Sequence, residues 1–346
     1  SIIVDHDGMP GLFKTGIQTG LRMNYMQIDH GVTILATGAL ANRPDEYGLG
    51  SQGNVMTQLE LDSLLEEDEE KIKSMEQVVM IQCVGSREPG NPNCSRICCQ
   101  AAMKNALRLK AINPEIQVFV LYRDIRTYGF MEDYYREARD KGVKFIRFNL
   151  DNKPTVREEE GKAVVRVHDF ILGQDIDIEA DVVALSTGLV ADDETTEDLA
   201  ITFHIPRTLD NYFQEDHVKL RPVDMALRGF FVAGTAHSPK IIRESVTQAL
   251  AVAGRARTML AKKEINLGAA VAKVDGKKCA TCLVCVRACP FDIPFINQDR
   301  YSEIDPAKCH GCGVCVGECP AKAIQLAAYE DDQILAKLDG LFERYN

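Results

Sequence analysis

CATCLVCVRACP at residues 279–290 and CHGCGVCVGECP at residues 309–320 are two copies of one cysteine pattern. Each copy reads C-x2-C-x2-C-x3-C-P, so three thiols lie on one tight loop and the fourth lies at a short helix that ends before proline. This spacing is typical of chains that hold two [4Fe–4S] cubanes. Zinc sites use two C-x2-C pairs instead, and disulfides need no such even spacing. The stretch therefore predicts two iron–sulfur clusters.

The fourth cysteine of each copy is expected to bind the cluster of the other copy. The first ligand set is then Cys279, Cys282, Cys285 and Cys319, and the second is Cys309, Cys312, Cys315 and Cys289. We expect Gly311 and Gly313 to let backbone N–H groups approach the cluster sulfides, which helps to set the reduction potential. The result is a pseudo-twofold ferredoxin domain with a C-terminal tail, over residues 266–346.

Length, charge and cysteine content limit the domains, partners and compartment that we expect for the rest of the chain. A sequence of 346 residues with 45% hydrophobic residues is long enough for further domains. The net charge of −11 disfavours nucleic acid, and we expect the acidic run at 66–70 to be a solvated helix face. Twelve cysteines without a signal peptide favour a reducing cytoplasm, and no apolar run is long enough to span a bilayer.

The remaining four cysteines lie in a β-α turn, at Cys83, Cys94, Cys98 and Cys99. Strand signals at 78–85 and 115–124 flank a helix signal at 94–112. The turn lacks G-x-G-x-x-G, and Tyr122 and Arg123 stand where a ribose-binding acidic residue is expected, so NAD binding is disfavoured. We expect a third cubane here, because a helix N-terminus lowers the pKa of thiols. The alternative is four buried apolar thiols.

Two strands end on the same small-residue turn. GVTILATGA at 31–39 and DVVALSTGL at 181–189 both close on Thr-Gly, an ending that recurs where flavoproteins pass the chain close to a flavin. They bracket an inserted domain. Within and beside it the patterns predict a helix over 132–141, strands over 143–150 and 163–172, a hairpin tip at 158–161 and a solvated loop at 192–198.

GFFVAGTAHSPKIIRESVTQALAVAGRA at 229–256 predicts a strand, a glycine turn and a long helix, with Ser238 as N-cap and Pro239 at the first position. Free N–H groups there favour the pyrophosphate or the reduced ring of a flavin. The alternative is an ordinary capped amphipathic helix. Together with the two Thr-Gly endings, the segment favours FAD, with contacts from Ala36, Thr37, Gly38, Thr187, Gly188, Gly234, Thr235, Lys240, Ile241 and Gln248.

QCVGSR, NPNCSRICC, LYRDIRTYG, KLRPVD and FVAGTAHSPKIIRESVTQA, followed by the double cysteine motif, resemble the A-subunit family of heterodisulfide reductase. The resemblance runs from Gly31 to the end of the sequence. It implies an α/β, thioredoxin-reductase-like two-dinucleotide-fold flavoprotein, present in part, with a C-terminal two-[4Fe–4S] ferredoxin domain. It places the family's unusual cluster on Cys83, Cys94, Cys98 and Cys99, and it matches Lys104 to a lysine near the flavin ring.

The same resemblance implies a division into domains. Residues 1–75 are expected to form part of an FAD-binding domain, 76–175 an inserted NAD-domain-like region with the third cluster, and 176–265 the return of the FAD-binding domain. The family also has an N-terminal cluster domain, a G-x-G-x-x-G for the adenine half of FAD and a second inserted ferredoxin, which we do not find. We therefore expect either a separate chain that supplies the missing FAD half or a longer polypeptide of which this is a portion.

The function that the resemblance implies is that of an oxidoreductase subunit with FAD and three [4Fe–4S] clusters. It would relay or bifurcate electrons among a hydrogenase or formate dehydrogenase side, ferredoxin and disulfide-reducing B/C-like subunits, with Lys104 stabilising the anionic reduced flavin. Alternatives are a non-bifurcating subunit of a quinone-interacting or aromatic-ring reductase complex, and a cluster-bearing adaptor without flavin. The missing dinucleotide fingerprint disfavours a pyridine-nucleotide reductase. For Lys104 the alternative is a solvated helix lysine.

Overall fold

The computed structural model describes residues 1–265 and 270–343, in two compact units. Unit 2 comprises residues 37–192 and 234–247, and unit 1 comprises residues 1–36, 193–233 and the described part of 248–346. The chain thus enters unit 2 directly after the first strand that ends on Thr-Gly and leaves it shortly after the second. Parts of the predicted ferredoxin domain and its tail, at 266–269 and 344–346, lie outside the described residues.

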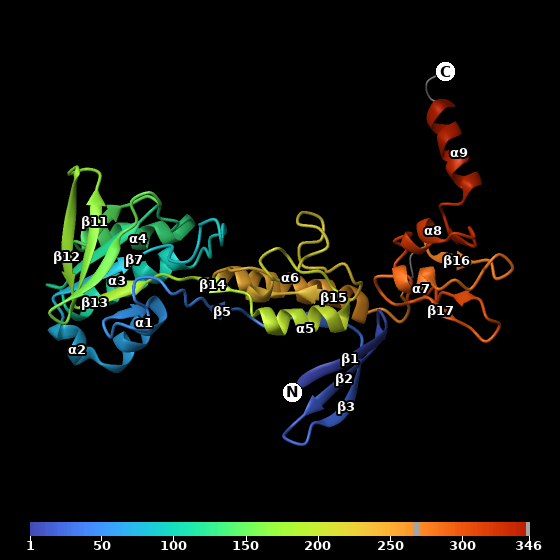
Figure 1. The fold of residues 1–346 in the computed structure, drawn as a ribbon, viewed down its shortest axis with the longest axis horizontal. Coiled ribbons are helices and arrows are strands. Elements are labelled where there is room, and N and C mark those ends of the chain that lie inside the picture. The colour runs from blue at the N-terminus through green and yellow to red at the C-terminus, as the bar shows by residue number, and fades with distance from the viewer. Residues whose placement is uncertain (266–269, 344–346) are drawn as a thin grey trace. The chain divides into compact units, whose positions relative to one another are not determined.

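Unit 2 is built on a five-stranded parallel sheet in the order β6-β13-β7-β8-β9 (Figure 1). Its strands are β6 (Val55–Thr57), β7 (Gln77–Ile81), β8 (Gln117–Tyr122), β9 (Lys144–Arg147) and β13 (Val182–Leu185). The sheet includes strands on both sides of the predicted inserted region 76–175, because β6 and β13 lie outside that range. The division into four domains stays a prediction.

Alternate residues of these strands face two separate cores. Val78 and Met80 of β7 pack with the helices α1 (Gln58–Glu67), α2 (Glu69–Ser74), α3 (Cys98–Ile112) and α4 (Glu132–Asp140). Val79 and Ile81 pack instead with an antiparallel sheet of β10 (Thr155–Glu159), β11 (Lys162–Asp169) and β12 (Gln174–Ala180). The parallel sheet is buried on both faces, which accounts for its continuous apolar strands. The hairpin tip at 158–161 is confirmed, since β10 and β11 join there.

Short elements complete unit 2. The two Thr-Gly endings lead into β5 (Leu40–Ala41) and β14 (Leu189–Val190), which pair antiparallel. The 3-10 turns η1 (Gly129–Met131) and η2 (Gly234–Ala236) precede α4 and α6 respectively. The acidic run 66–70 is exposed at the junction of α1 and α2, as predicted.

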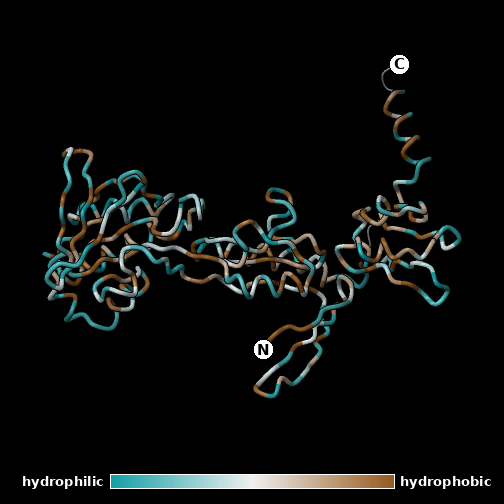
Figure 2. Tube along the Cα trace, viewed as in Figure 1, coloured by the Kyte–Doolittle hydropathy of each residue, from teal (hydrophilic) through white to brown (hydrophobic). Residues whose placement is uncertain are grey.

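Unit 1 begins with an antiparallel sheet of β1 (Ile2–Met9), β2 (Leu12–Thr19) and β3 (Asn24–His30), which the sequence patterns did not predict. The reason is that the apolar residues of β1 do not follow the alternation of buried apolar and exposed polar residues by which a strand is recognised. Figure 2 shows β1 starting as an apolar run, and both Ile2 and Val4 are exposed. Next, β4 (Thr33–Leu35) pairs parallel with β15 (Phe230–Val232). The predicted loop 192–198 is wrong, because α5 (Asp193–Phe203) begins there.

The predicted start of the long helix is also wrong. α6 runs from Ile242 to Leu260, so Ser238 is not its N-cap and Pro239 is not its first residue. The Lys240 ammonium donates to the carbonyls of Gly234 and Ser238 at 2.7 and 2.9 Å and holds this segment in a non-helical path. The side chain of Glu244, in the first turn of α6, accepts from the Ile241 N–H at 3.3 Å, directly before the helix.

The predicted ferredoxin domain is small and rich in turns, and it contains two short helices of matching position. Its elements are β16 (Ala272–Val274), α7 (Val284–Ala288), β17 (Phe295–Ile296), β18 (Ser302–Glu303), α8 (Val314–Glu318), β19 (Ile324–Leu326) and α9 (Asp331–Phe342). Each of α7 and α8 ends at the fourth cysteine of its copy, directly before proline, as the spacing predicts. No helix among the described residues is both long and apolar enough to cross a membrane.

The capping box of α1 gives a direct test of the helical face of unit 2. Thr57 accepts from the Glu60 N–H at 3.2 Å, and Glu60 accepts from the Thr57 N–H at 2.7 Å. Thr57→Ala should cost about 1 kcal/mol, seen as about fivefold faster hydrogen exchange of α1 amides. Ser63→Ala is the control, since its exposed hydroxyl only donates to the Leu59 carbonyl within the helix. Equal exchange rates in the two variants would contradict the assigned cap.

Candidate iron–sulfur centres

Two small cavities in the ferredoxin domain are each lined by four cysteines. One is lined by Cys279, Cys282, Cys285 and Cys319, and the other by Cys289, Cys309, Cys312 and Cys315. The structure thus brings together the residues of each predicted crossed set. The rest of both linings is mostly apolar, including Ile324 in the first and Ile304 in the second. Four sulfur donors around a small apolar space fit a [4Fe–4S] cubane.

Backbone N–H groups point at several of these sulfurs. The Sγ of Cys279 accepts from the N–H of Ser302 at 3.4 Å, and that of Cys309 accepts from the N–H of Ala272 at 3.4 Å. The Sγ of Cys319 accepts from the N–H of Ala323 at 3.3 Å. Such donors fix the orientation of a ligand and stabilise its charged form, so these bonds suit thiolates bound to iron.

The loops that carry the cysteines require left-handed backbone at matching positions. In the second copy these positions are Gly311 and Gly313, with φ of +67° and +78°, whereas the first copy has Thr281 and Leu283 at +55° and +64°. A Cβ on Gly311 would lie 2.1 Å from the carbonyl oxygen of Ala270. Gly311 is therefore also required sterically, in addition to the expected approach of N–H groups.

The third set of cysteines gathers at the carboxyl edge of the parallel sheet in unit 2. Cys83 follows β7, and Cys98 and Cys99 open α3. Burial raises the pKa of Cys98 far above its usual range, and the neighbouring Cys99, Cys83 and Cys94 raise it further. Burial likewise raises the pKa of Cys99 to about 11. The structure thus places the four thiols close enough to interact.

The expectation of lowered thiol pKa values at this helix N-terminus is wrong. Loss of solvent and repulsion among the four sulfurs outweigh the helix end, so without metal Cys98 and Cys99 stay protonated at neutral pH. Iron binding must therefore displace their protons, and the positive charge of the metal stabilises the thiolates that form. The four thiols therefore suit a metal centre because iron stabilises their deprotonated forms, and not because the helix end lowers their pKa values.

Arg123 organises the cysteine loop. Its guanidinium donates to the carbonyls of Ser86 at 2.5 Å, Arg87 at 2.8 Å and Cys83 at 3.4 Å. The side chain of Arg87 in turn pairs with both oxygens of Asp124, at 2.5 and 3.0 Å. From the sequence, Arg123 was notable only as a residue in place of a ribose-binding acid. The structure shows that it holds the backbone around Cys83.

The second Thr-Gly ending lies against the same loop. Gly188 has φ +77°, and a Cβ there would lie 2.2 Å from Ser95 Oγ and 3.5 Å from Cys98 Sγ. Ser95 also accepts from the Leu189 N–H at 3.0 Å, which ties the loop to the strand ending. Gly188 is predicted as a flavin contact, and its closest neighbours in the structure belong to the cysteine loop.

The other predicted flavin contacts are divided between the units. Ala36 and Gln248 belong to unit 1, and the rest belong to unit 2. Within unit 2, a Cβ on Gly38 would lie 3.9 Å from Thr235 Oγ1, so these two predicted contacts are neighbours. The N–H of Ile241 donates to Glu244, which also accepts from the Tyr128 hydroxyl at 3.0 Å and pairs with Arg96. No local sequence signal points to this network, because Glu244 is more than a hundred positions from both Arg96 and Tyr128.

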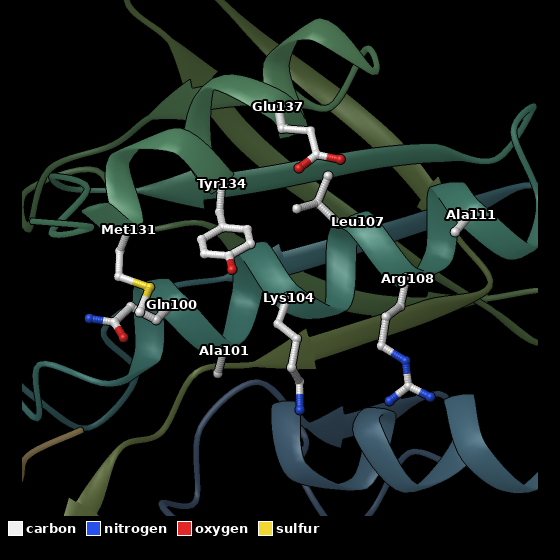
Figure 3. A pocket seen from close by; sticks show the side chains of 9 residues that line it. All are labelled: Gln100, Ala101, Lys104, Leu107, Arg108, Ala111, Met131, Tyr134 and Glu137. Atoms are coloured by element: carbon white, nitrogen blue, oxygen red, sulfur yellow. The ribbon is translucent and has the colours of Figure 1, made fainter. Parts of the chain in front are cut away.

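Lys104 lies on α3 beside a groove between α3 and α4, with a cavity volume of about 590 Å³. Figure 3 shows the side chains of Lys104 and Arg108 extending toward α1, away from Tyr134 and Glu137 on α4. Both cations pair with Asp62 of α1, at 2.7 and 3.0 Å. The proposed role of Lys104 toward a flavin stays a prediction.

Within residues 1–265 and 270–343, no three or more His, Cys, Asp or Glu side chains converge closely enough to hold a metal ion. A cubane differs from a single ion, because its four thiolates stand apart around an iron–sulfur core. Cysteine sets that surround a cavity are the arrangement that a cluster needs.

Comparison with known proteins agrees with the cysteine sets. Residues 272–320 match the family described as "4Fe-4S dicluster domain". The chain is 39% identical, over 336 residues and 90% of its length, to an iron–sulfur A-subunit of the CoB–CoM heterodisulfide reductase of Methanopyrus kandleri, of which it covers 50%. It is 38% identical, over 91% of its length, to the A-subunit of the H2/formate:CoB-CoM heterodisulfide,ferredoxin reductase of Methanococcus maripaludis, of which it covers 51%.

The chain therefore spans about half the length of the curated relatives it matches. Among solved structures, thioredoxin reductase of Lactococcus lactis aligns with a TM-score of 0.47 and 15% identity, over 75% of this chain and 74% of that one. A likeness at this level carries no functional argument. The α/β class with a C-terminal dicluster domain is confirmed.

Gly311→Ala should impair loading of the second ferredoxin cluster, because the new Cβ meets the Ala270 carbonyl and the left-handed backbone is strained. We expect loss of one cluster, measured by anaerobic iron and sulfide analysis together with electron paramagnetic resonance (EPR). Gly317→Ala is the matched control in the same domain, since a Cβ there meets no atom within 4 Å. Full cluster content in both variants would show that the loop tolerates a side chain at position 311.

Proposed function

We propose that this chain, which is similar to heterodisulfide reductase A-subunits over about nine-tenths of its own length, is an iron–sulfur and FAD electron-transfer subunit of a heterodisulfide-reductase-type complex. Its proposed cofactors are three [4Fe–4S] clusters and FAD. Its proposed partners are disulfide-reducing subunits, a hydrogenase-linked or formate-dehydrogenase-linked subunit, ferredoxin, and a source of the missing FAD half.

The observation that carries this proposal is the arrangement of the twelve cysteines. They form three sets of four: two line cavities in the ferredoxin domain, and one gathers at the carboxyl edge of the parallel sheet. Ligands of open α/β sheets bind at that edge. In a dinucleotide-binding unit the same β-α turn holds a pyridine nucleotide, so the cysteines stand in the place of a hydride carrier.

This placement has a chemical consequence. Iron–sulfur clusters transfer one electron at a time, whereas a hydride carries two, and a flavin can do either. A flavin connected to cysteine-bound clusters can therefore release its two electrons singly to different acceptors. On this ground we propose that the flavin bifurcates electrons. The less specific proposal is that it relays electrons singly in another complex, without bifurcation.

The protein contributes position and environment to this chemistry. Sulfur ligands with N–H donors stabilise the charged centre. Cys285, Cys315 and Cys319 are buried, whereas Cys282 and Cys312 are exposed, so each ferredoxin site is shielded from water on one side only. Arg123 fixes the loop of the third set, and Gly188 lets the strand ending approach Cys98. Each feature limits reorganisation when an electron arrives.

A flavin-free, cluster-bearing adaptor is the second candidate, and one observation favours it. Two predicted flavin contacts are already engaged within the chain: the Lys240 ammonium donates to Gly234 and Ser238, and the Ile241 N–H donates to Glu244. The flavin absorbance of the native complex distinguishes the two candidates. Absence of flavin from a complex with intact clusters would favour the adaptor.

The third cluster can be tested through Cys98. We expect about twelve irons per native chain and about eight in Cys98→Ala, with both ferredoxin signals kept and electron flow through the flavin lost. The measurements are anaerobic iron analysis, EPR and turnover. Cys319→Ala is the matched control, since it should remove a ferredoxin cluster and keep the third. A Cys98→Ala variant with about twelve irons and full electron transfer would show that these thiols serve only as core packing.

The role of Lys104 can be separated from that of its ion pair. If its ammonium stabilises an anionic reduced flavin, Lys104→Ala should lower the flavin midpoint potential in the FAD-bound complex, measured by anaerobic redox titration. Arg108→Ala is the control, because it removes the other cation paired with Asp62 on the same helix. Unchanged flavin potentials in both variants would identify Lys104 as a structural surface lysine.

A further inference from the structure

We propose that Gln82 and Ser186 donate hydrogen bonds to the cluster held by Cys83, Cys94, Cys98 and Cys99, and that they raise its reduction potential. This inference rests on the proposed third cluster. It assigns two positioning residues, neither of which binds iron, to a site for which sequence reasoning named only the ligands.

The first observation is a group of buried polar atoms without partners. Gln82 and Ser186 are each 1% exposed. The amide nitrogen and oxygen of Gln82 and the hydroxyl of Ser186 have no hydrogen-bond partner among the described residues. A buried polar group without a partner is costly, so such groups in a native fold call for an explanation. The iron–sulfur cluster proposed at this site is a polar neighbour that supplies such an explanation.

The second observation is that the two residues are neighbours. Gln82 directly follows β7, and Ser186 directly follows β13, which is adjacent to β7 in the sheet. The Ser186 N–H donates to the Ile81 carbonyl at 2.9 Å, and the Val84 N–H donates to the Ser186 carbonyl at 3.1 Å. The ladder between the two strands therefore continues through both positions.

The third observation is the face on which they lie. Ile81 and Leu185 belong to the core on the β10–β12 side of the sheet, whereas Met80 and Ala184 belong to the core under the helices. Because side chains alternate along a strand, Gln82 and Ser186 face the helices as well. The helix α3 on that side begins with Cys98 and Cys99. The unpaired donors thus lie on the side from which these ligands approach the sheet edge.

The chemistry of the two groups matches such a neighbour. An amide offers two N–H donors and a hydroxyl offers one, while thiolates and cluster sulfides accept hydrogen bonds. A donor stabilises the more negative, reduced cluster more than the oxidised one, so it raises the potential. Removing either donor should lower the potential of this cluster and leave the ferredoxin clusters unchanged.

The test uses the full chain with its clusters, anaerobically, and follows the EPR signal of the third cluster in a redox titration. Gln82→Leu and Ser186→Ala should each lower the ratio of reduced to oxidised third cluster at fixed potential about tenfold, which is about 59 mV for one electron. Met80→Leu is the control, because it is a buried residue of the same strand and face without a polar atom. Electron–nuclear double resonance should also lose an exchangeable proton coupling in Gln82→Leu.

The outcomes separate this inference from the proposed function. Potentials and proton couplings that match the wild type, with the third signal intact, would overturn the inference and assign the donors to buried water. A wild-type chain with only two cluster signals would instead overturn the third cluster itself. If Gln82→Leu loses the signal altogether, Ser186→Ala decides: a lowered potential supports the inference, and an unchanged one overturns it.

Discussion

The burial of closely spaced thiols is the constraint on which this structure depends. Burial, and to a lesser extent the neighbouring cysteines, raise the pKa values of Cys99 and Cys315 to about 11. At the third set the Arg87 guanidinium donates to the Cys83 sulfur at 3.8 Å, but the pKa values of Cys98 and Cys99 are raised nonetheless. The compensating charge has to come from iron. The cysteine loops are therefore shaped for an occupant whose charge the fold itself does not replace.

In the function proposed above, unit 2 holds an iron–sulfur cluster where a dinucleotide-binding unit holds its nucleotide. Its parallel sheet, crossover helix and carboxyl-edge turn follow the general plan of dinucleotide-binding units. In place of the glycine-rich turn there is a longer loop, and the guanidinium of Arg123 binds three carbonyls of that loop. A positive side chain thus orders backbone where an acidic one would bind a ribose. The plan of the sheet is kept while the chemistry at its edge changes.

The sequence predicted local features well and long-range ones poorly. The crossed ligand sets could be named because cysteine spacing is a local signal, and the β-α-β unit because its strands are apolar throughout. The predicted start of α6 was wrong because the Lys240 ammonium binds the Ser238 carbonyl and Glu244 accepts from the Ile241 N–H, two side-chain contacts that a capping motif does not reveal. The predicted lowering of the thiol pKa values was wrong because a sequence motif does not show how deeply Cys98 and Cys99 are buried. Gln82 and Ser186 lie in segments that the sequence marks, QCVGSR and DVVALSTGL, but no pattern singles out their side chains, since a polar residue becomes informative only when its partner is missing.

The crossing of ligands between the two halves of the ferredoxin domain has a consequence for how the chain matures. Under the proposed ligation, a cluster that joins Cys279 to Cys319 is a covalent cross-link between segments that leave the ribosome at different times. Closing such a loop restricts the unfolded chain and favours the folded one, as other cross-links do. Neither cubane can be completed until both halves have been synthesised.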